Sequence, residues 1–101
     1  MKFPKFEIDE AKVIEIAKLY GVSELYLFGS VLTENFNANS DIDFLISFKN
    51  DSEISFLELY ELKGKLSKYL QRPVDLIEKE GLTNPFRREN IINTARKLYG
   101  N

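Results

Sequence analysis

The sequence predicts an α/β (α+β) fold with a small mixed central sheet of three or more strands flanked by helices. Three short apolar runs, at residues 25–28, 41–48 and 74–77, have strand length. The segments around them repeat apolar residues at helical spacing, which gives the order helix, strand, strand, helix, strand, helix. With 101 residues and 44% hydrophobic content, the chain is expected to form one domain, residues 1–101.

The first part of the chain predicts a helix after a short N-terminal segment. Residues 1–7 are expected to form an arm or an edge strand. A helix is predicted from Asp9 to Tyr20, with Asp9 as its N-cap and Gly21 just beyond its end. Its apolar face is predicted to contain Val13, Ile16, Ala17 and Tyr20.

The middle of the chain predicts two strands that are joined by a polar loop. The first strand, Leu25–Phe28, is broken by Gly29, and residues 34–40 are rich in loop-forming residues. In the second strand, Asp41–Phe48, alternate side chains point to opposite faces. Asp41 and Asp43 should therefore share one face, while the other should face a core through Ile42, Phe44, Ile46 and Phe48.

The last part of the chain predicts two helices around a third strand. Ser52 or Ser55 should cap a helix over residues 55–70, with a broad apolar stripe of Phe56, Leu59, Tyr60, Leu62, Leu66, Tyr69 and Leu70. Gly64 is a weak point in that helix. Residues 74–77 form the strand. Asn84-Pro85 should begin a final helix with apolar residues at Ile91, Ile92, Ala95, Leu98 and Tyr99.

Composition excludes several kinds of active site. The chain has no cysteine and no histidine, so thiolate zinc sites and Ser-His or Cys-His catalysis are excluded. A net charge of -2 argues against tight nucleic-acid binding. No signal-peptide run or membrane-span-length run is present, so a cytoplasmic protein is expected.

The remaining polar pattern is typical of phosphoryl transfer. Gly29 and Ser30 follow a strand, where glycine lets a phosphate approach the backbone and serine adds a donor. Asp41, Asp43 and Asp75 lie in or at neighbouring strands. Carboxylates in this pattern could hold Mg²⁺ in a two-metal site that activates a hydroxyl and holds a leaving pyrophosphate.

Simpler interpretations of these residues remain open. Asp75 could be a structural acid that pairs with Arg72 or with a helix start, and Ser30 could only cap the turn that follows it. Ser40 is expected to bridge the loop and the strand, with a minor orienting role at the nucleotide.

Phe28-Gly29-Ser30 and Ser40-Asp41-Ile42-Asp43 together resemble the signature of the DNA polymerase β-type nucleotidyltransferase superfamily, and the small size resembles its minimal nucleotidyltransferase (MNT) branch. The resemblance implies that Asp41, Asp43 and Asp75 are catalytic and bind metal. It also implies that Gly29 and Ser30 bind the nucleotide, and we add Ser40 to that group.

The resemblance further implies transfer of AMP from ATP, with Mg²⁺, to an acceptor hydroxyl. In MNT/HEPN toxin–antitoxin modules the MNT protein resembles an antitoxin that adenylylates a tyrosine of the HEPN toxin. One departure is that no basic residue follows Ser30 until Lys49, whereas many relatives carry arginine there. Replacements could come from Lys63, Lys65, Lys68, Arg72, Arg87 and Arg88. The alternative function is a non-catalytic antitoxin that masks its partner.

Overall fold

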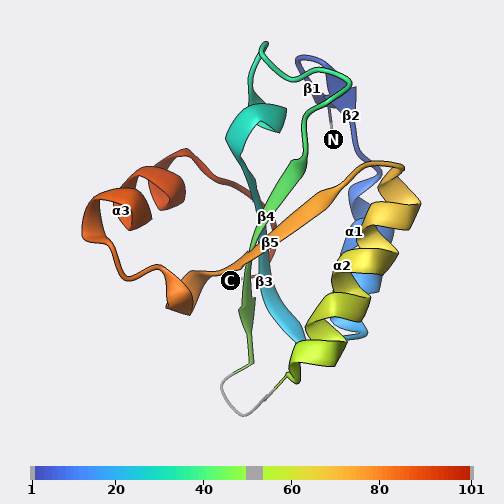
Figure 1. Cartoon of the computed structure of the whole chain (residues 1–101), viewed down its shortest axis with the longest axis vertical. Helices are drawn as coiled ribbons and strands as arrows, with labels where there is room; N and C mark the ends of the chain where they lie inside the picture. Colours follow the sequence, from blue (N-terminus) through green and yellow to red (C-terminus); the bar gives the residue numbers. More distant parts are fainter. Residues whose placement is uncertain (1, 50–53, 101) are drawn as a thin grey trace.

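The computed structural model describes residues 2–49 and 54–100 and contains a four-stranded mixed sheet in the order β5-β4-β3-β6. β4 pairs in parallel with β5, and β3 pairs antiparallel with both β4 and β6. Helices α1 and α2 cover one face of the sheet, and α3 lies on the other side (Figure 1). The predicted fold class is therefore confirmed. The strands are β3 (Val22–Phe28), β4 (Ile42–Phe48), β5 (Val74–Glu78) and β6 (Arg96–Tyr99).

Each helix begins at a polar cap. α1 (Glu10–Lys18) begins after Asp9, whose carboxylate accepts from the backbone N–H of Lys12. α2 (Phe56–Leu70) begins after Ser55; the other predicted cap, Ser52, lies outside the described residues. α3 (Pro85–Thr94) has Asn84 as its cap and proline at its first turn, as predicted. α1 ends two residues earlier than expected, and Gly21 turns the chain into β3 with a φ of 78°.

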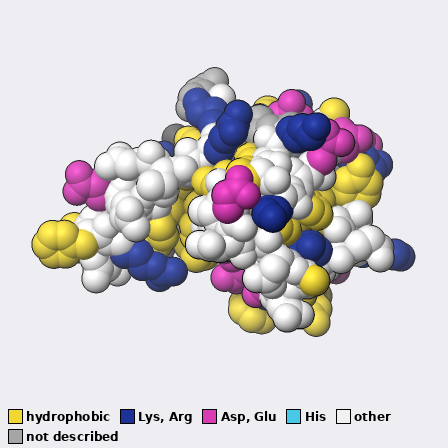
Figure 2. All heavy atoms as spheres, turned by 90° about the horizontal axis from the view of Figure 1, so that it is seen from above, with side chains coloured by type: hydrophobic (Ala, Val, Ile, Leu, Met, Phe, Trp, Pro, Cys, Tyr) yellow, Lys and Arg dark blue, Asp and Glu magenta, His cyan; other side chains and the backbone are white. Residues whose placement is uncertain are grey.

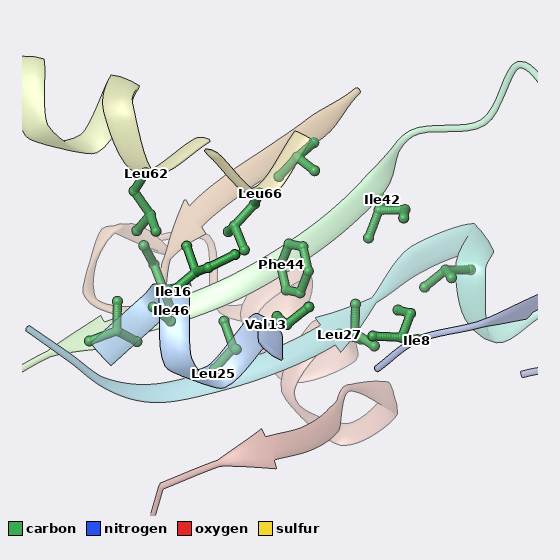
Figure 3. Close-up of a cluster of buried hydrophobic side chains, with 14 of the residues drawn as sticks. Ile8, Val13, Ile16, Leu25, Leu27, Ile42, Phe44, Ile46, Leu62 and Leu66 are labelled. Carbon is green, nitrogen blue, oxygen red and sulfur yellow. The ribbon is translucent and has the colours of Figure 1, made fainter. Parts of the chain in front are cut away.

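The core lies between the sheet and helices α1 and α2 (Figure 3). Ile42, Phe44 and Ile46 point into it from β4, as the alternation in the sequence predicts, and all three are fully buried. Leu62 and Leu66 close it from α2. A second, smaller cluster on the α3 side contains Phe28, Leu45, Leu82 and Ile91. The two central strands, β3 and β4, therefore supply both clusters.

The N-terminal segment forms a hairpin of its own. β1 (Lys2–Phe3) pairs antiparallel with β2 (Phe6–Glu7), separate from the main sheet. Phe3 is buried in the core, and the ring of Phe6 lies 5.3 Å from that of Phe36. The expected arm is thus a two-stranded unit packed beside the 33–40 loop.

The predicted extent of the last helix was wrong. α3 ends at Thr94, and residues 96–99 form β6 along the outer side of β3. The hydroxyl of Thr94 donates to the backbone oxygen of Asn90 at 2.7 Å, a bond that is typical of a weakening helix end. Leu98 and Tyr99 therefore reach the core from a strand, where they also pair the edge of β3.

The predicted apolar stripe of α2 was too broad. Leu62 and Leu66 are buried, but Phe56 is 86% exposed and Tyr60 is 68% exposed. Leu57, on the same turn as Phe56, is also exposed. The N-terminal half of α2 thus presents aromatic side chains to solvent. Within residues 2–49 and 54–100, every helix is too short or too polar to span a bilayer.

Candidate active site

The turn after β3 lies directly beside an acid of β4. Phe28 is the register partner of Asp43, and Gly29 follows in a short 3₁₀ turn, Gly29–Leu32. Gly29 has a φ of 81°, and a Cβ at this position would collide with the carboxylate oxygen of Asp43. Only glycine satisfies both conditions. The predicted Gly-Ser turn and the predicted acid are therefore neighbours in the fold.

A second acid lies on the next strand. Asp43 and Asp75 are register partners in the parallel pair β4–β5, so their Cα atoms face one another across the ladder. Asp41 lies just before β4 and, like Asp75, is exposed, whereas Asp43 is partly buried. The sheet thus gathers Asp43, Asp75 and the Gly29 turn at one end of three adjacent strands.

The electrostatics at Asp43 are unfavourable in the protein alone. Partial burial raises the pKa of Asp43, and the negative charges of Asp75 and then Asp41 raise it further. Among the described residues, none of the three acids forms a salt bridge. The site therefore holds negative charge that forms no ion pair with any of the side chains in residues 2–49 and 54–100.

The three acids do not form a complete metal cage. Within the described ranges, no group of three or more Asp, Glu, His or Cys side chains is arranged to hold a metal ion. The expected three-carboxylate site is therefore not preformed. Mg²⁺ is commonly held by one or two carboxylates together with substrate phosphates, and the Asp43–Asp75 pair fits that mode of binding.

The two serines differ in their surroundings. Ser30 lies at the start of the 3₁₀ turn and is partly exposed, and its backbone oxygen accepts from the hydroxyl of Thr33 at 2.8 Å. The hydroxyl of Ser40 accepts from the backbone N–H of Asn37 at 3.0 Å. Ser40 therefore closes the turn before β4, which is the bridging role expected from the sequence.

Arg72 has a role that the sequence did not reveal. Its guanidinium donates to the backbone oxygens of Asn37 at 2.7 Å and Ser40 at 3.1 Å, and lies 4.4 Å from the ring centre of Phe36. This residue fixes the loop that leads to Asp41. The interpretation of Asp75 as the partner of Arg72 was wrong. The Arg72-Pro73 step before a strand was visible in the sequence, but its loop partners were not.

A groove between α2 and β5 borders the acids. A cavity of about 540 Å³ includes Asp41 and Asp75, and a smaller one of about 150 Å³ adjoins it and shares Tyr60, Lys63 and Asp75. We call the two together the α2–β5 groove. Its other lining residues are Phe56, Leu59, Gly64, Ser67, Pro73, Val74 and Leu76. Of the basic residues proposed to replace the missing arginine, Lys63 lines this groove.

A different carboxylate on the same face of the sheet is well compensated. Glu24 accepts from the Tyr26 hydroxyl at 2.6 Å and lies 3.5 Å from the Lys79 ammonium. The hydrogen bond from Tyr26 and the charge of Lys79 lower the pKa of Glu24. The same bond is the main cause that raises the pKa of Tyr26 to about 12.

On the face of the molecule that is seen from above, acidic and basic side chains are interspersed (Figure 2).

Comparison with known proteins gives a consistent result. Residues 10–98 match the family described as nucleotidyltransferase domain. The "Putative protein adenylyltransferase MJ0126" of Methanocaldococcus jannaschii is 38% identical over 77 residues, which is 76% of each chain.

Solved structures share the fold. A structure described as a minimal nucleotidyltransferase has a TM-score of 0.71 and 27% identity, covering 85% of each chain. A toxin-antitoxin crystal structure with AMP-PNP has a TM-score of 0.77 and 24% identity, covering 93% of this chain and 75% of the other. An MNT antitoxin in complex with tri-AMPylated Shewanella oneidensis HEPN toxin has a TM-score of 0.67 and 23% identity, covering 91% and 70%. The chain therefore belongs to the nucleotidyltransferase domain family.

Proposed function

We propose that this protein is an Mg²⁺-dependent adenylyltransferase that transfers AMP from ATP to a tyrosine hydroxyl of a HEPN-domain partner, and so acts as its antitoxin. The observation that carries the proposal is the placement of the Gly29 turn against Asp43, with Asp75 as the register partner of Asp43. The relatives named as adenylyltransferases and the complexes with a HEPN toxin support the acceptor. Because the reaction consumes ATP, we propose the cytoplasm as its compartment.

The site residues would have two tasks, which are to hold the nucleotide and to accept the proton of the acceptor hydroxyl. Gly29 would let the phosphates of ATP approach the backbone, and Ser30 would donate to them. The acceptor oxygen forms a bond to the α-phosphorus while the bond from that phosphorus to the bridging oxygen breaks and pyrophosphate leaves. The phenolic proton passes to Asp75 or to water. Asp41 and Asp43, with Asp75, would hold Mg²⁺, which would supply positive charge for the phosphates and the leaving group.

A transfer assay tests the proposal. The protein is incubated with labelled ATP, Mg²⁺ and the HEPN-domain protein encoded beside it. Wild type should label the partner, and an Asp41→Ala/Asp43→Ala variant should not. Glu24→Gln serves as a matched control because it removes a carboxylate at the other end of the same face. Equal labelling by wild type and the double variant would exclude catalysis at this site.

Ligand binding gives an independent measurement. Bound Mg²⁺ and ATP should stabilise only the folded state, by ~2–3 kcal/mol at saturating ligand. We expect millimolar Mg²⁺ with ATP to raise the melting temperature of wild type by several degrees. The same ligands should not raise the melting temperature of the double variant.

A second candidate function is masking of the partner without catalysis. It is favoured by the absence of a preformed three-carboxylate cage among the described residues and by the lack of a basic residue between Ser30 and Lys49. Under this function, Asp43→Asn should protect cells from the partner as well as wild type does. Loss of protection in that single variant would exclude masking as the whole function.

A further inference from the structure

Gly64 lies in the middle of α2 without a structural need for glycine. A Cβ at this position would meet nothing within 4 Å, and the residue is exposed. Glycine is less favourable than alanine in a helix interior because it loses more backbone freedom on folding. Packing against the part of the chain that the structure describes therefore does not explain the glycine. Gly64 does line the α2–β5 groove, where the missing side chain leaves the helix backbone open to close approach.

The groove follows one face of α2. Phe56, Tyr60 and Gly64 are spaced four residues apart, so they lie in a row along the helix, and all three line the groove. Phe56 and Tyr60 are two exposed aromatic residues that do not belong to the core. Two wide aromatic side chains and one glycine thus make a floor that is aromatic at one end and low at the other.

The other wall of the groove is an open strand edge. β5 ends the sheet order and, within the described part of the chain, pairs only with β4. An edge strand presents a row of backbone N–H and C=O groups that can pair with another extended chain. Val74, Asp75 and Leu76 supply this wall, so the edge runs alongside the aromatic floor.

We propose that the α2–β5 groove binds the acceptor segment of the partner protein as an extended strand added beside β5. This inference rests on the proposed function and names how its acceptor binds. An extended polypeptide satisfies the edge groups of β5 through its own backbone, and Gly64 gives that backbone room against α2. Asp41 and Asp75 line the same groove, so a segment lying there contacts two of the carboxylates proposed for transfer.

Substitution of Gly64 separates acceptor binding from ATP binding. Gly64→Leu replaces glycine with a strong helix former, so the isolated protein should melt at a higher temperature than wild type. Its side chain fills the groove, and we expect the KM for the HEPN-domain partner to rise about tenfold or more, with the thermal shift caused by Mg²⁺ and ATP unchanged. Gly81→Leu is the matched control, because a Cβ at Gly81 also meets nothing within 4 Å but lies outside the groove.

The KM of Gly64→Leu and the labelling by wild type test the groove and the proposed function separately. A wild-type KM in Gly64→Leu would overturn the groove while leaving the proposed function intact. If wild type does not label the partner at all, the proposed function is wrong. The proposal that the groove binds the acceptor segment is then wrong as well.

Hydrogen exchange tests the strand geometry directly. Binding of the partner should slow amide exchange at alternate residues of β5, where N–H groups point to the open edge, by about tenfold or more. β6, the strand at the opposite edge, should be unaffected and serves as the internal control. Protection that is confined to α3 or β6 would overturn the proposal.

Discussion

Glu24 and Asp43 are carboxylates on the same face of the sheet, near opposite ends of the β3–β4 pair, and their surroundings differ sharply. Glu24 has a tyrosine hydroxyl and a lysine ammonium as partners, which lower its pKa. Asp43 has partial burial and two neighbouring acids, which raise its pKa. The same face thus contains one acid that stabilises the folded chain and one that opposes it. This difference is what we expect if Asp43 binds a ligand, as proposed, and does not serve stability.

Catalysis should depend on Asp43 and not on Glu24. Asp43→Asn is expected to lower the rate of AMP transfer by about 100-fold or more, the usual result of removing one preorganised electrostatic group. Glu24→Gln should retain the rate, because its partners lie at the other end of the face. Steady-state rates with labelled ATP give both values. Similar losses in the two variants would remove the distinction between them.

Gly29 tests how closely the turn packs on Asp43. Gly29→Ala places a side chain at positive φ and against the Asp43 carboxylate, so it should destabilise the fold by about 2 kcal/mol. In the Asp43→Ala background the collision is gone, and the same substitution should be milder. Urea unfolding of the four proteins measures the coupling. Additive effects would mean that the turn does not contact the acid.

The stability effects of the two acids should have opposite signs. Without divalent cations, Asp43→Asn should stabilise the protein by about 0.5 kcal/mol, after solvent screening is allowed for, since it removes a repelling charge. Glu24→Gln should destabilise it by a similar amount. With magnesium and ATP present, wild type should have a higher melting temperature than Asp43→Asn, which is the reverse of the order without ligand. Destabilisation by Asp43→Asn in metal-free buffer would contradict the assignment.

The hydrogen bond between Tyr26 and Glu24 should show in the pH dependence of stability. The folded pKa of Glu24 lies below its ordinary value of 4.5, so its contribution is present above pH 4.5 and is lost as the pH falls through the folded pKa. The folded pKa of Tyr26, about 12, lies above its ordinary 10.0, so its contribution is lost as the pH rises from 10 to 12. Tyr26→Phe should therefore lower stability most between about pH 5 and 10, by some tenths of a kcal/mol. If the difference in stability between wild type and Tyr26→Phe does not become smaller at low or at high pH, the result would contradict this hydrogen bond.

Local patterns in the sequence predicted much of the sheet and the helix starts. Asp9, Ser55 and Asn84 each cap a helix as expected, because capping needs only a polar side chain a few residues from free N–H groups. The alternation in β4 predicted which residues enter the core. The adjacency of Gly29, Asp43 and Asp75 followed from strand order, although the functional roles of these residues remain predictions.

Long-range pairing could not be predicted in this way. Residues 96–99 fit helical spacing, yet they form β6 because β3 offers an edge that their backbone can pair. Tyr60 and Phe56 fit the stripe of α2, but the core is already filled by Leu62 and Leu66. The contacts of Arg72 with Asn37 and Ser40 join segments more than 30 residues apart and left no pattern in the sequence.

The open edge of β5 also bears on self-association. Exposed strand edges promote aggregation, and charged side chains along an edge oppose it. Asp75 and Glu78 are both exposed on β5, so two copies that paired through this strand in antiparallel fashion would bring like charges together. The acid proposed for catalysis would thus also keep copies of the protein apart when no partner covers the edge.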